Sequence, residues 1–181
     1  MVECVKGDVL ENASGLEQDV CEGSAFRVCF VCTGNTCRSP MAAAVANAMA
    51  AQGALTGAPT VEAMSAGLYA AEGEPIAQNA VLALEDANIV PVSGRDYHDH
   101  TAHTLTAEEA ERFDLLIGLG GGHCMELLMR FPQVAQRIVG MPTPISDPYG
   151  GSLTVYRQCL EEITRGVREL LFSSHEEGDD A

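Results

Sequence analysis

The sequence predicts a single α/β domain built on a four-stranded parallel sheet with helices on both faces. Two observations lead to this expectation. The chain has 181 residues, of which 46% are hydrophobic, and a chain of this length and apolar content folds as one domain with a sizeable core. In addition, short apolar segments that favour strands alternate with longer segments that favour helices, and this alternation is typical of parallel sheets.

The first half of the chain supplies two strands and two helices. Residues 26–31, FRVCFV, are short and apolar, as expected of a buried strand. Residues 40–52 are rich in alanine and favour a helix, which ends at Gly53. A weaker strand is expected at 60–64. Residues 76–87 repeat apolar side chains at helical spacing, so they are expected to form the second helix.

The second half continues the same alternation. Residues 106–109, Thr-Ala-Glu-Glu, have the capping-box pattern that begins a helix. Strands are expected at 115–119 and 137–141, and the helix between them, at 122–131, ends before a proline. Residues 152–172 complete the domain as a long helix with one apolar face.

The net charge of −16 is concentrated at the two ends of the chain. Residues 1–24 carry six acidic side chains against one basic one, and residues 173–181 carry four acidic side chains and no Lys or Arg. We therefore expect mobile acidic extensions on either side of a folded body at 25–172. A polyanion repels phosphate backbones and anionic lipids, so nucleic acid and membrane partners are not expected.

The sequence also predicts a cytoplasmic protein. No apolar run is long enough for a transmembrane helix, and the first residues lack the basic and apolar regions of a signal peptide. The seven cysteines are odd in number, which favours free thiols in a reducing compartment over a disulfide framework.

The segment CTGNTCRSP, between the first strand and the first helix, is predicted to be a phosphate-binding loop. Gly34 allows successive backbone amides to point inward, and the helix N-terminus adds partial positive charge. These amides and Arg38 would stabilise Cys32 as a nucleophilic thiolate. Arg38 can hold two phosphoryl oxygens, and Ser39 can donate to the thiolate. A lone cysteine is more often structural, but this combination suits attack on a phosphate monoester.

The loop VCTGNTCRSPMA resembles that of the low-molecular-weight protein phosphatases, which act on phosphotyrosine or phosphoarginine; the arginine phosphatases are the closest branch. The other matching segments are Ser-Ala-Gly at 65–67, HTAHTLT at 100–106, FDLLI at 113–117 and DPYGG at 147–151. His103 stands where the family usually has arginine, and Ala43 where it usually has glutamate. Residues 1–24 and 173–181 fall outside the resemblance.

The resemblance implies a role for each matching position. Cys32 would be the nucleophile, and Asp147 the general acid that then activates water. The phosphate loop would be lined by Thr33, Gly34, Asn35, Thr36, Cys37, Arg38 and Ser39. Asn35, Ser65 and His100 would form a supporting hydrogen-bond network. Phosphorylated proteins would be the substrates and inorganic phosphate the product and an inhibitor; no cofactor and no metal are implied.

Asp147 can also be placed without the resemblance, because it follows the fourth strand and so lies at the same edge of the sheet as the loop. An Asp before proline is often only a turn former. His98, His100 and His103 have a spacing that could hold a metal, but no cysteine or carboxylate cluster accompanies them. The glycines at 118–122 resemble a dinucleotide fingerprint, but His123 stands where a small residue is required.

Three functions remain compatible with the loop: a protein phosphatase, an arsenate reductase and a phosphate-binding module without catalysis. Arsenate reductases with a similar loop need two further cysteines after the third strand, where only Cys124 lies, and usually have glutamine where this chain has Pro40. The joint presence of Cys32, Arg38 and Asp147 argues against a module without catalysis. The phosphatase is therefore favoured.

Thr36 and Tyr149 bear on the substrate. The tyrosine-directed branch looks bulky and aliphatic at the position of Thr36, whereas the arginine-directed branch resembles this Thr, whose hydroxyl can bond a guanidino nitrogen. Tyr149 could instead stack on the ring of phosphotyrosine, so a protein-tyrosine phosphatase is the alternative. Cys37 is expected to resolve an oxidised Cys32 as a disulfide, unless it only packs behind the loop.

Overall fold

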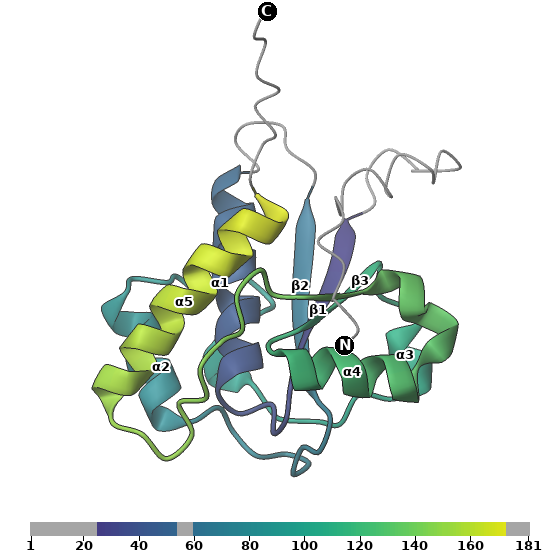
Figure 1. Cartoon of the computed structure of the whole chain (residues 1–181). Coiled ribbons are helices and arrows are strands. Elements are labelled where there is room, and N and C mark those ends of the chain that lie inside the picture. The colour runs from purple at the N-terminus through teal and green to yellow at the C-terminus, as the bar shows by residue number, and fades with distance from the viewer. Residues whose placement is uncertain (1–24, 54–59, 173–181) are drawn as a thin grey trace, which may run out of the picture.

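The computed structural model describes residues 25–53 and 60–172, so the expectations for residues 1–24 and 173–181 lie outside the described residues (Figure 1). Four strands form one parallel sheet in the order β2-β1-β3-β4. They are β1 (Phe26–Cys32), β2 (Val61–Gly67), β3 (Leu115–Gly118) and β4 (Ile138–Gly140). The predicted α/β domain with four parallel strands is confirmed.

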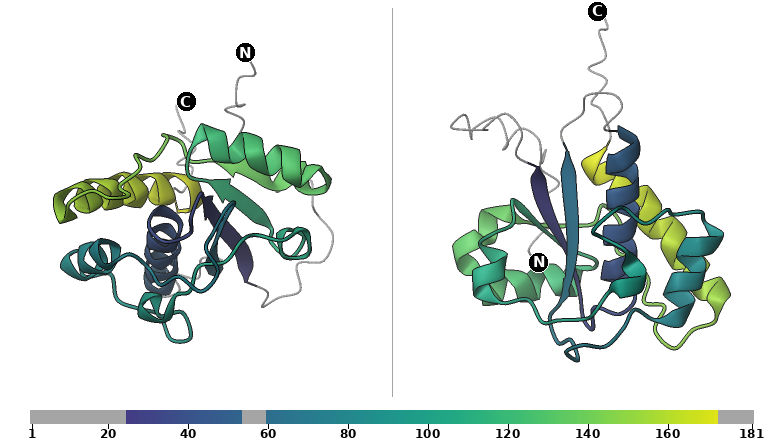
Figure 2. Two further views of the ribbon diagram at one scale, coloured as in Figure 1. Left: turned by 90° about the horizontal axis from the view of Figure 1, so that it is seen from below. Right: turned by 180° about the vertical axis from the view of Figure 1, so that it is seen from behind.

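Helices cover both faces of this sheet (Figure 2). One face carries α1 (Arg38–Gly53), α2 (Gln78–Asp86) and α5 (Leu153–Leu171), and the other carries α3 (Ala107–Ala110) and α4 (Gly121–Arg130). The short 3-10 helices η2 (Tyr97–Asp99) and η3 (Pro132–Arg137) were not predicted. No helix in the described part of the chain has the length and apolar character needed to cross a membrane.

Strand β1 divides its side chains between two hydrophobic cores. Val28 and Phe30 pack with residues of α1, α2 and α5, whereas Cys29 and Val31 pack with residues of α3 and α4. Successive side chains of a strand point to opposite faces, so a strand covered on both sides must be apolar throughout. This double burial explains the apolar run from Val28 to Cys32, whereas Phe26 and Arg27 at the start of β1 are exposed.

Several boundaries differ from the sequence predictions, two of them at the site end of the sheet. Strand β2 continues to Gly67, three residues beyond its predicted end, because it pairs in register with β1 as far as Cys32. Helix α1 begins at Arg38 rather than at residue 40. Strand β4 is a short edge strand whose three residues are all half-buried. The remaining ends shift by one or two residues.

The capping box before α3 is confirmed. The Thr106 hydroxyl accepts a hydrogen bond from the Glu109 amide at 3.2 Å, and the Glu109 carboxylate accepts one from the Thr106 amide at 3.0 Å. These two bonds satisfy amides that the first turn of a helix otherwise leaves without partners. They begin a helix of only four residues at a defined position.

Candidate active site

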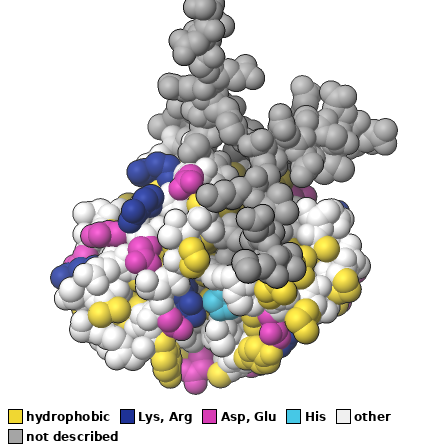
Figure 3. Space-filling model, in the orientation of Figure 1, with side chains coloured by type: hydrophobic (Ala, Val, Ile, Leu, Met, Phe, Trp, Pro, Cys, Tyr) yellow, Lys and Arg dark blue, Asp and Glu magenta, His cyan; other side chains and the backbone are white. Residues whose placement is uncertain are grey.

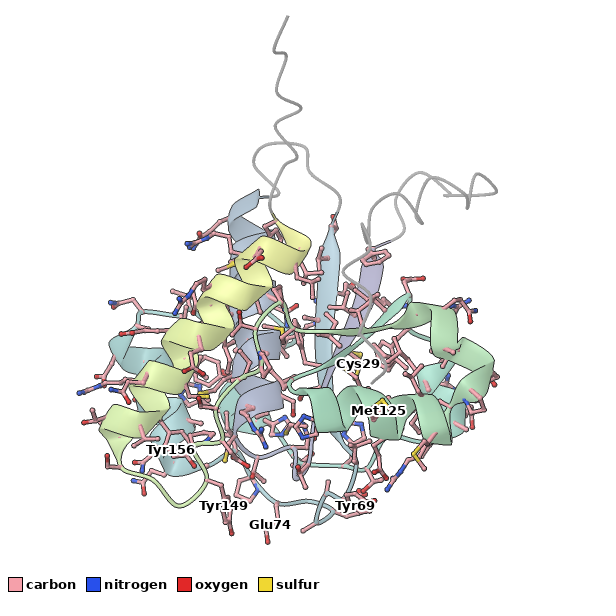
Figure 4. All side chains as sticks on the ribbon, in the orientation of Figure 1. Cys29, Tyr69, Glu74, Met125, Tyr149 and Tyr156 are labelled. Atoms are coloured by element: carbon pink, nitrogen blue, oxygen red, sulfur yellow. The ribbon has the colours of Figure 1, made fainter. Side chains whose placement is uncertain are left out.

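The loop that joins β1 to α1 lines a pocket of about 770 Å³ at the carboxyl ends of the strands. Residues of the loop and its flanks that line the pocket are Cys32, Thr33, Gly34, Thr36, Cys37 and Arg38; Asp147 and Tyr149 join them from the segment before α5. Tyr69, Glu74 and Tyr149 lie along one edge of the molecule and form the outer rim (Figure 4). The topology thus brings residues far apart in sequence to one edge of the sheet.

Cys32 ends strand β1 and is almost completely buried at the base of the pocket. Its Sγ lies 3.0 Å from the Ser39 hydroxyl, in the first turn of α1. Ser39 accepts a hydrogen bond from Asn35 Nδ2 at 3.0 Å, so its own single proton can be donated either to the Ala66 carbonyl, at 3.3 Å, or to Cys32. A hydroxyl donated in this way stabilises a thiolate more than a thiol.

Asn35 holds the middle of the β1–α1 loop in a conformation that few residues adopt. Its φ is +56°, in the left-handed region that asparagine tolerates better than most residues. Its Nδ2 also donates to the Ser65 hydroxyl at 3.0 Å, and its Oδ1 accepts from the His103 amide at 3.1 Å. The backbone carbonyl of Asn35 accepts from His100 Nε2 at 2.7 Å. Of the residues expected to form a supporting network, Ser65 therefore contacts the side chain of Asn35 and His100 contacts its backbone carbonyl.

His100 is held as a neutral ring in this network. Its Nε2 carries the proton, because a carbonyl oxygen can only accept a hydrogen bond. Burial lowers the pKa of His100, and the bond to Asn35 opposes this effect in part. The ring therefore acts as a fixed donor that shapes the loop, rather than as a charge facing the pocket.

The start of the loop packs closely against the end of β2. The Leu68 amide donates to the carbonyl of Cys32 and the Tyr69 amide donates to the carbonyl of Thr33, both at 2.9 Å. A Cβ on Gly67 would lie 2.8 Å from the Thr33 carbonyl oxygen, so only glycine permits this approach. Gly67 of the Ser-Ala-Gly segment is therefore required for the geometry of the loop.

Arg38 and Asp147 form an ion pair inside the pocket. Arg38 Nη2 donates to Asp147 Oδ2 at 2.8 Å, and the Arg38 side chain is only 10% exposed. The other carboxylate oxygen of Asp147 accepts from the Tyr149 amide at 3.2 Å, which is the turn that a residue before proline is expected to make. Asp147 therefore both forms the turn before α5 and lies in the pocket.

Thr36 and Cys37 face different surroundings. Thr36 lines the pocket, and its carbonyl accepts from the Ala77 amide at 2.8 Å. The Cys37 Sγ is buried and lies 3.1 Å from the hydroxyl of Tyr156 in α5. Burial, with a further contribution from Cys37, raises the pKa of Tyr156. Cys37 therefore links the loop to the last helix as well as lining the pocket.

The three histidines with metal-like spacing have separate partners. His98 contacts Asp96 and Glu85, at 2.6 and 3.2 Å, and His103 Nε2 lies 3.5 Å from Glu109. His100 contacts the loop, as described above. Among the described residues, no three His, Cys, Asp or Glu side chains are arranged to hold a metal ion.

Three other cysteines are buried outside the pocket lining, in β1, α4 and α5: Cys29, Cys124 and Cys159. Burial raises the pKa of the Cys29 thiol, and it raises that of Cys159 to about 12. Thiols of this kind are poor nucleophiles near neutral pH. Cys124 and Cys159 lie on different helices, so they do not form the adjacent pair that the arsenate-reductase alternative requires.

Sequence reasoning missed His123, Tyr69 and Glu74 as residues of the site. The two rim residues follow β2, and His123 lies in the first turn of α4 with its Nε2 3.1 Å from the Thr33 hydroxyl. The position of His123 directly after the third strand was a usable signal, because the carboxyl ends of parallel strands meet at one edge. The glycines before it resemble a dinucleotide fingerprint, and His123 was considered only as the residue that argues against that interpretation.

Comparisons with known proteins agree with this geometry. The sequence profile of the family described as "Low molecular weight phosphotyrosine protein phosphatase" matches residues 27–179. A protein-arginine-phosphatase of Geobacillus stearothermophilus is 33% identical over 145 residues, which cover 76% of this chain and 88% of that protein.

Solved structures share the fold as well. A low molecular weight protein tyrosine phosphatase from T. tengcongensis is 35% identical and superposes with a TM-score of 0.71, covering 81% of this chain and 97% of that one. A YwlE arginine phosphatase mutant with a phosphorylated active site serine is 29% identical, with a TM-score of 0.70, covering 80% of this chain and 92% of that one.

Proposed function

The chain belongs to the low molecular weight phosphotyrosine protein phosphatase family, and from that premise we propose that Cys32, Arg38 and Asp147 hydrolyse phosphorylated protein side chains, with phosphoarginine preferred. The observation that carries the proposal is the convergence of these three side chains on one pocket. A thiol, a guanidinium and a carboxylate at the mouth of an amide-lined loop suit phosphoryl transfer through a covalent intermediate.

The proposed reaction has two steps. In the first, the Cys32 thiolate attacks phosphorus, the bond from phosphorus to the leaving nitrogen or oxygen breaks, and Asp147 protonates that leaving atom. In the second, the Asp147 carboxylate takes a proton from water, the water oxygen attacks phosphorus, and Cys32 leaves as a thiolate. The loop amides and Arg38 hold the phosphoryl oxygens throughout. The hydroxyl of Ser39, 3.0 Å from Sγ, stabilises the thiolate before and after each turnover.

The preference for phosphoarginine rests on Thr36 and on the relatives. Thr36 lies between Cys32 and Arg38 in the sequence, and it lines the same pocket. We place it beside the path of the group that phosphorus carries. The Thr36 hydroxyl makes a hydrogen bond of 3.6 Å with Cys37 Sγ, and the oxygen, which has two lone pairs, can in addition accept from a guanidino N–H. Proteins named as arginine phosphatases are 33% and 31% identical to this chain. The segment with Gly150 and Gly151 after Asp147 also resembles that branch.

Protein-tyrosine phosphatase activity is the second candidate, and a specific observation favours it. Tyr69 and Tyr149 lie at the rim of the pocket and are 62% and 81% exposed. Exposed rings at the entrance can stack on the phenyl ring of phosphotyrosine. Relatives named as tyrosine phosphatases reach similar identity, such as 32% over 167 residues in Streptomyces coelicolor.

The proposal extends to partners and location. Phosphorylated proteins are the proposed substrates, and inorganic phosphate is both the product and an inhibitor because it fits the same loop. Nucleic acid and membranes are not proposed as partners, given the net charge of −16. A cytoplasmic location is proposed because a nucleophilic thiol such as Cys32 has to stay reduced to act.

Turnover of phosphoarginine and phosphotyrosine peptides, measured side by side, tests the proposal. The expected result is hydrolysis of both with a higher kcat/KM for phosphoarginine. A higher value for phosphotyrosine would favour the second candidate. Turnover of neither peptide, with thioredoxin-dependent reduction of arsenate, would replace the phosphatase by the redox alternative.

A further inference from the structure

Two separate sets of hydrogen bonds hold the β1–α1 loop, and only one of them has been given a role in the proposed function. Asn35 and its network fix the middle of the loop, as described above. The residue directly after the nucleophile, Thr33, is held differently. Its carbonyl accepts from the Tyr69 amide at 2.9 Å, and its hydroxyl contacts His123 Nε2 at 3.1 Å. The side chain of Thr33 is thus tied to α4, across the sheet edge from β2.

Gly118, the last residue of β3, brings His123 into reach of the loop. A Cβ on Gly118 would lie 2.7 Å from Cys124 Sγ and 2.9 Å from the Cys124 amide nitrogen. Glycine at this position therefore lets the first turn of α4 pack directly on the end of β3. His123 precedes Cys124 in that turn, and its own amide donates to the carbonyl of Gly120 at 3.0 Å. Of the glycines at 118–122, Gly118 is the one that the helix packing requires, since a Cβ on Gly121 or Gly122 would meet no atom within 4 Å.

The other ring nitrogen of His123 has no polar partner within the described residues. His123 Nδ1 is buried and makes no hydrogen bond there. Burial lowers the pKa of His123, and the positive charge of Arg38 lowers it further, against a smaller opposing effect of Asp147. A space-filling view shows a histidine beside basic and acidic side chains on one face of the molecule (Figure 3). A neutral ring that donates its Nε2 proton to the Thr33 hydroxyl fits these surroundings, because its buried Nδ1 then carries no proton, whereas a charged ring would leave a buried N–H unpaired.

We propose that His123 is a positioning residue of the active site, which acts through its hydrogen bond to Thr33 to hold the part of the loop that follows the nucleophile. The inference rests on the proposed phosphatase function, since its effect is on how the loop binds a phosphoryl group. His123 need not touch the substrate. It fixes the loop from the β3 side, while Asn35 fixes it from within, so the amides of the loop stay aimed at one point.

Three variants test the role of this hydrogen bond. His123→Leu and Thr33→Val each remove it, and each should raise the inhibition constant of inorganic phosphate by roughly 3- to 10-fold, the effect of one hydrogen bond. The double variant should be no worse than either single one, because both remove the same contact. His123→Gln can still bond the Thr33 hydroxyl, so it should recover most of the affinity. His98→Leu is the matched control, because His98 contacts Asp96 and Glu85 outside the loop.

The readouts are the phosphate inhibition constant and the kcat/KM for p-nitrophenyl phosphate, with Tm measured for every variant. Additive losses, a Gln variant no better than the Leu variant, or losses that follow Tm without any change in phosphate affinity would overturn the inference. If His123→Leu does not fold, Thr33→Val and His123→Gln still decide the matter. A wild-type chain that binds no phosphate and hydrolyses no ester would instead refute the proposed function itself.

Discussion

Arg38 and Asp147 are joined by a hydrogen-bonded ion pair of 2.8 Å, although they are more than one hundred positions apart in the chain. The pair links the residue expected to hold the phosphoryl group with the residue expected to protonate the leaving group. Arg38 is almost buried, whereas the Asp147 side chain is 54% exposed. The guanidinium is therefore the fixed partner and the carboxylate the one that can move toward a leaving atom when phosphate oxygens engage Arg38.

Replacing Asp147 by Asn should slow the reaction according to the quality of the leaving group. The amide keeps an acceptor for Arg38 but cannot supply a proton. For phenyl phosphate, a poor leaving group, we expect kcat/KM to fall about 100-fold or more. For p-nitrophenyl phosphate the loss should be much smaller, because nitrophenolate leaves without protonation. Steady-state kinetics on both esters give the comparison, and equal losses would remove Asp147 from the role of general acid.

Replacing Thr36 by Ile should shift the substrate preference. The larger side chain fills space that the guanidino group needs and removes a hydroxyl that can bond it, while a phenyl ring tolerates an apolar neighbour. The loss of a hydrogen bond to a charged group is worth ~1.5–3 kcal/mol, or about 10- to 100-fold in the ratio of kcat/KM values. Thr36→Ser, which keeps the hydroxyl, is the matched control. A parallel fall on both substrates would mean that Thr36 only supports the loop.

His100 should make the folded chain sensitive to acid. Burial lowers its pKa below the ordinary value of 6.5, so the unfolded chain takes up a proton on this ring at a higher pH than the folded chain does. The stability that depends on neutral His100 is complete above about pH 6.5 and is lost as the pH falls from there through the lower pKa of the folded state. His100→Gln keeps a donor for the Asn35 carbonyl but does not titrate. Urea unfolding at about pH 7.5 and about pH 5.5 should show the wild type losing more stability than this variant; equal losses would contradict the account.

Peroxide should inactivate the enzyme reversibly. The Cys32 thiolate would be oxidised to a sulfenic acid with reduction of peroxide to water, and the Cys37 thiol would then displace water to form a disulfide. Dithiothreitol should restore activity, and Cys37→Ala should shift the loss toward irreversible oxidation. The contact of Cys37 with Tyr156, at 3.1 Å, would have to break for this step. Mass spectrometry of the oxidised loop peptide identifies the partner, and a different partner or no disulfide would refute the prediction.

The sequence was sufficient for the local parts of the fold. The apolar run of β1, the alanine-rich α1 and the capping box before α3 depend on neighbouring residues, so they can be read from the chain. The extension of β2 to Gly67 could not, because it comes from pairing with β1. For the same reason the edge position of β4 needed the order of the strands.

The features of the site also fall into those that the sequence could predict and those that it could not. The loop from Cys32 to Ser39 is continuous in sequence, so its place between β1 and α1 could be predicted from residue types and spacing. Asp147 could be placed at the correct edge of the sheet, but its bond to Arg38 could not. The contact between Thr33 and His123 depends on how closely α4 packs on β3, which Gly118 decides through a steric effect. Sequence position places His123 at this edge of the sheet, but it does not predict the hydrogen bond itself.

The measurement that tests the central claim most directly is the identity of the phosphorylated residue during turnover. The enzyme would be mixed with p-nitrophenyl phosphate, quenched within the first turnover, digested and analysed by mass spectrometry, with Cys32→Ser as the control for position. The account predicts one phosphoryl group on Cys32 in the wild-type chain, formed as fast as the first nitrophenolate is released. A phosphoryl group on another residue, or release of nitrophenolate at the full rate by Cys32→Ser, would contradict it.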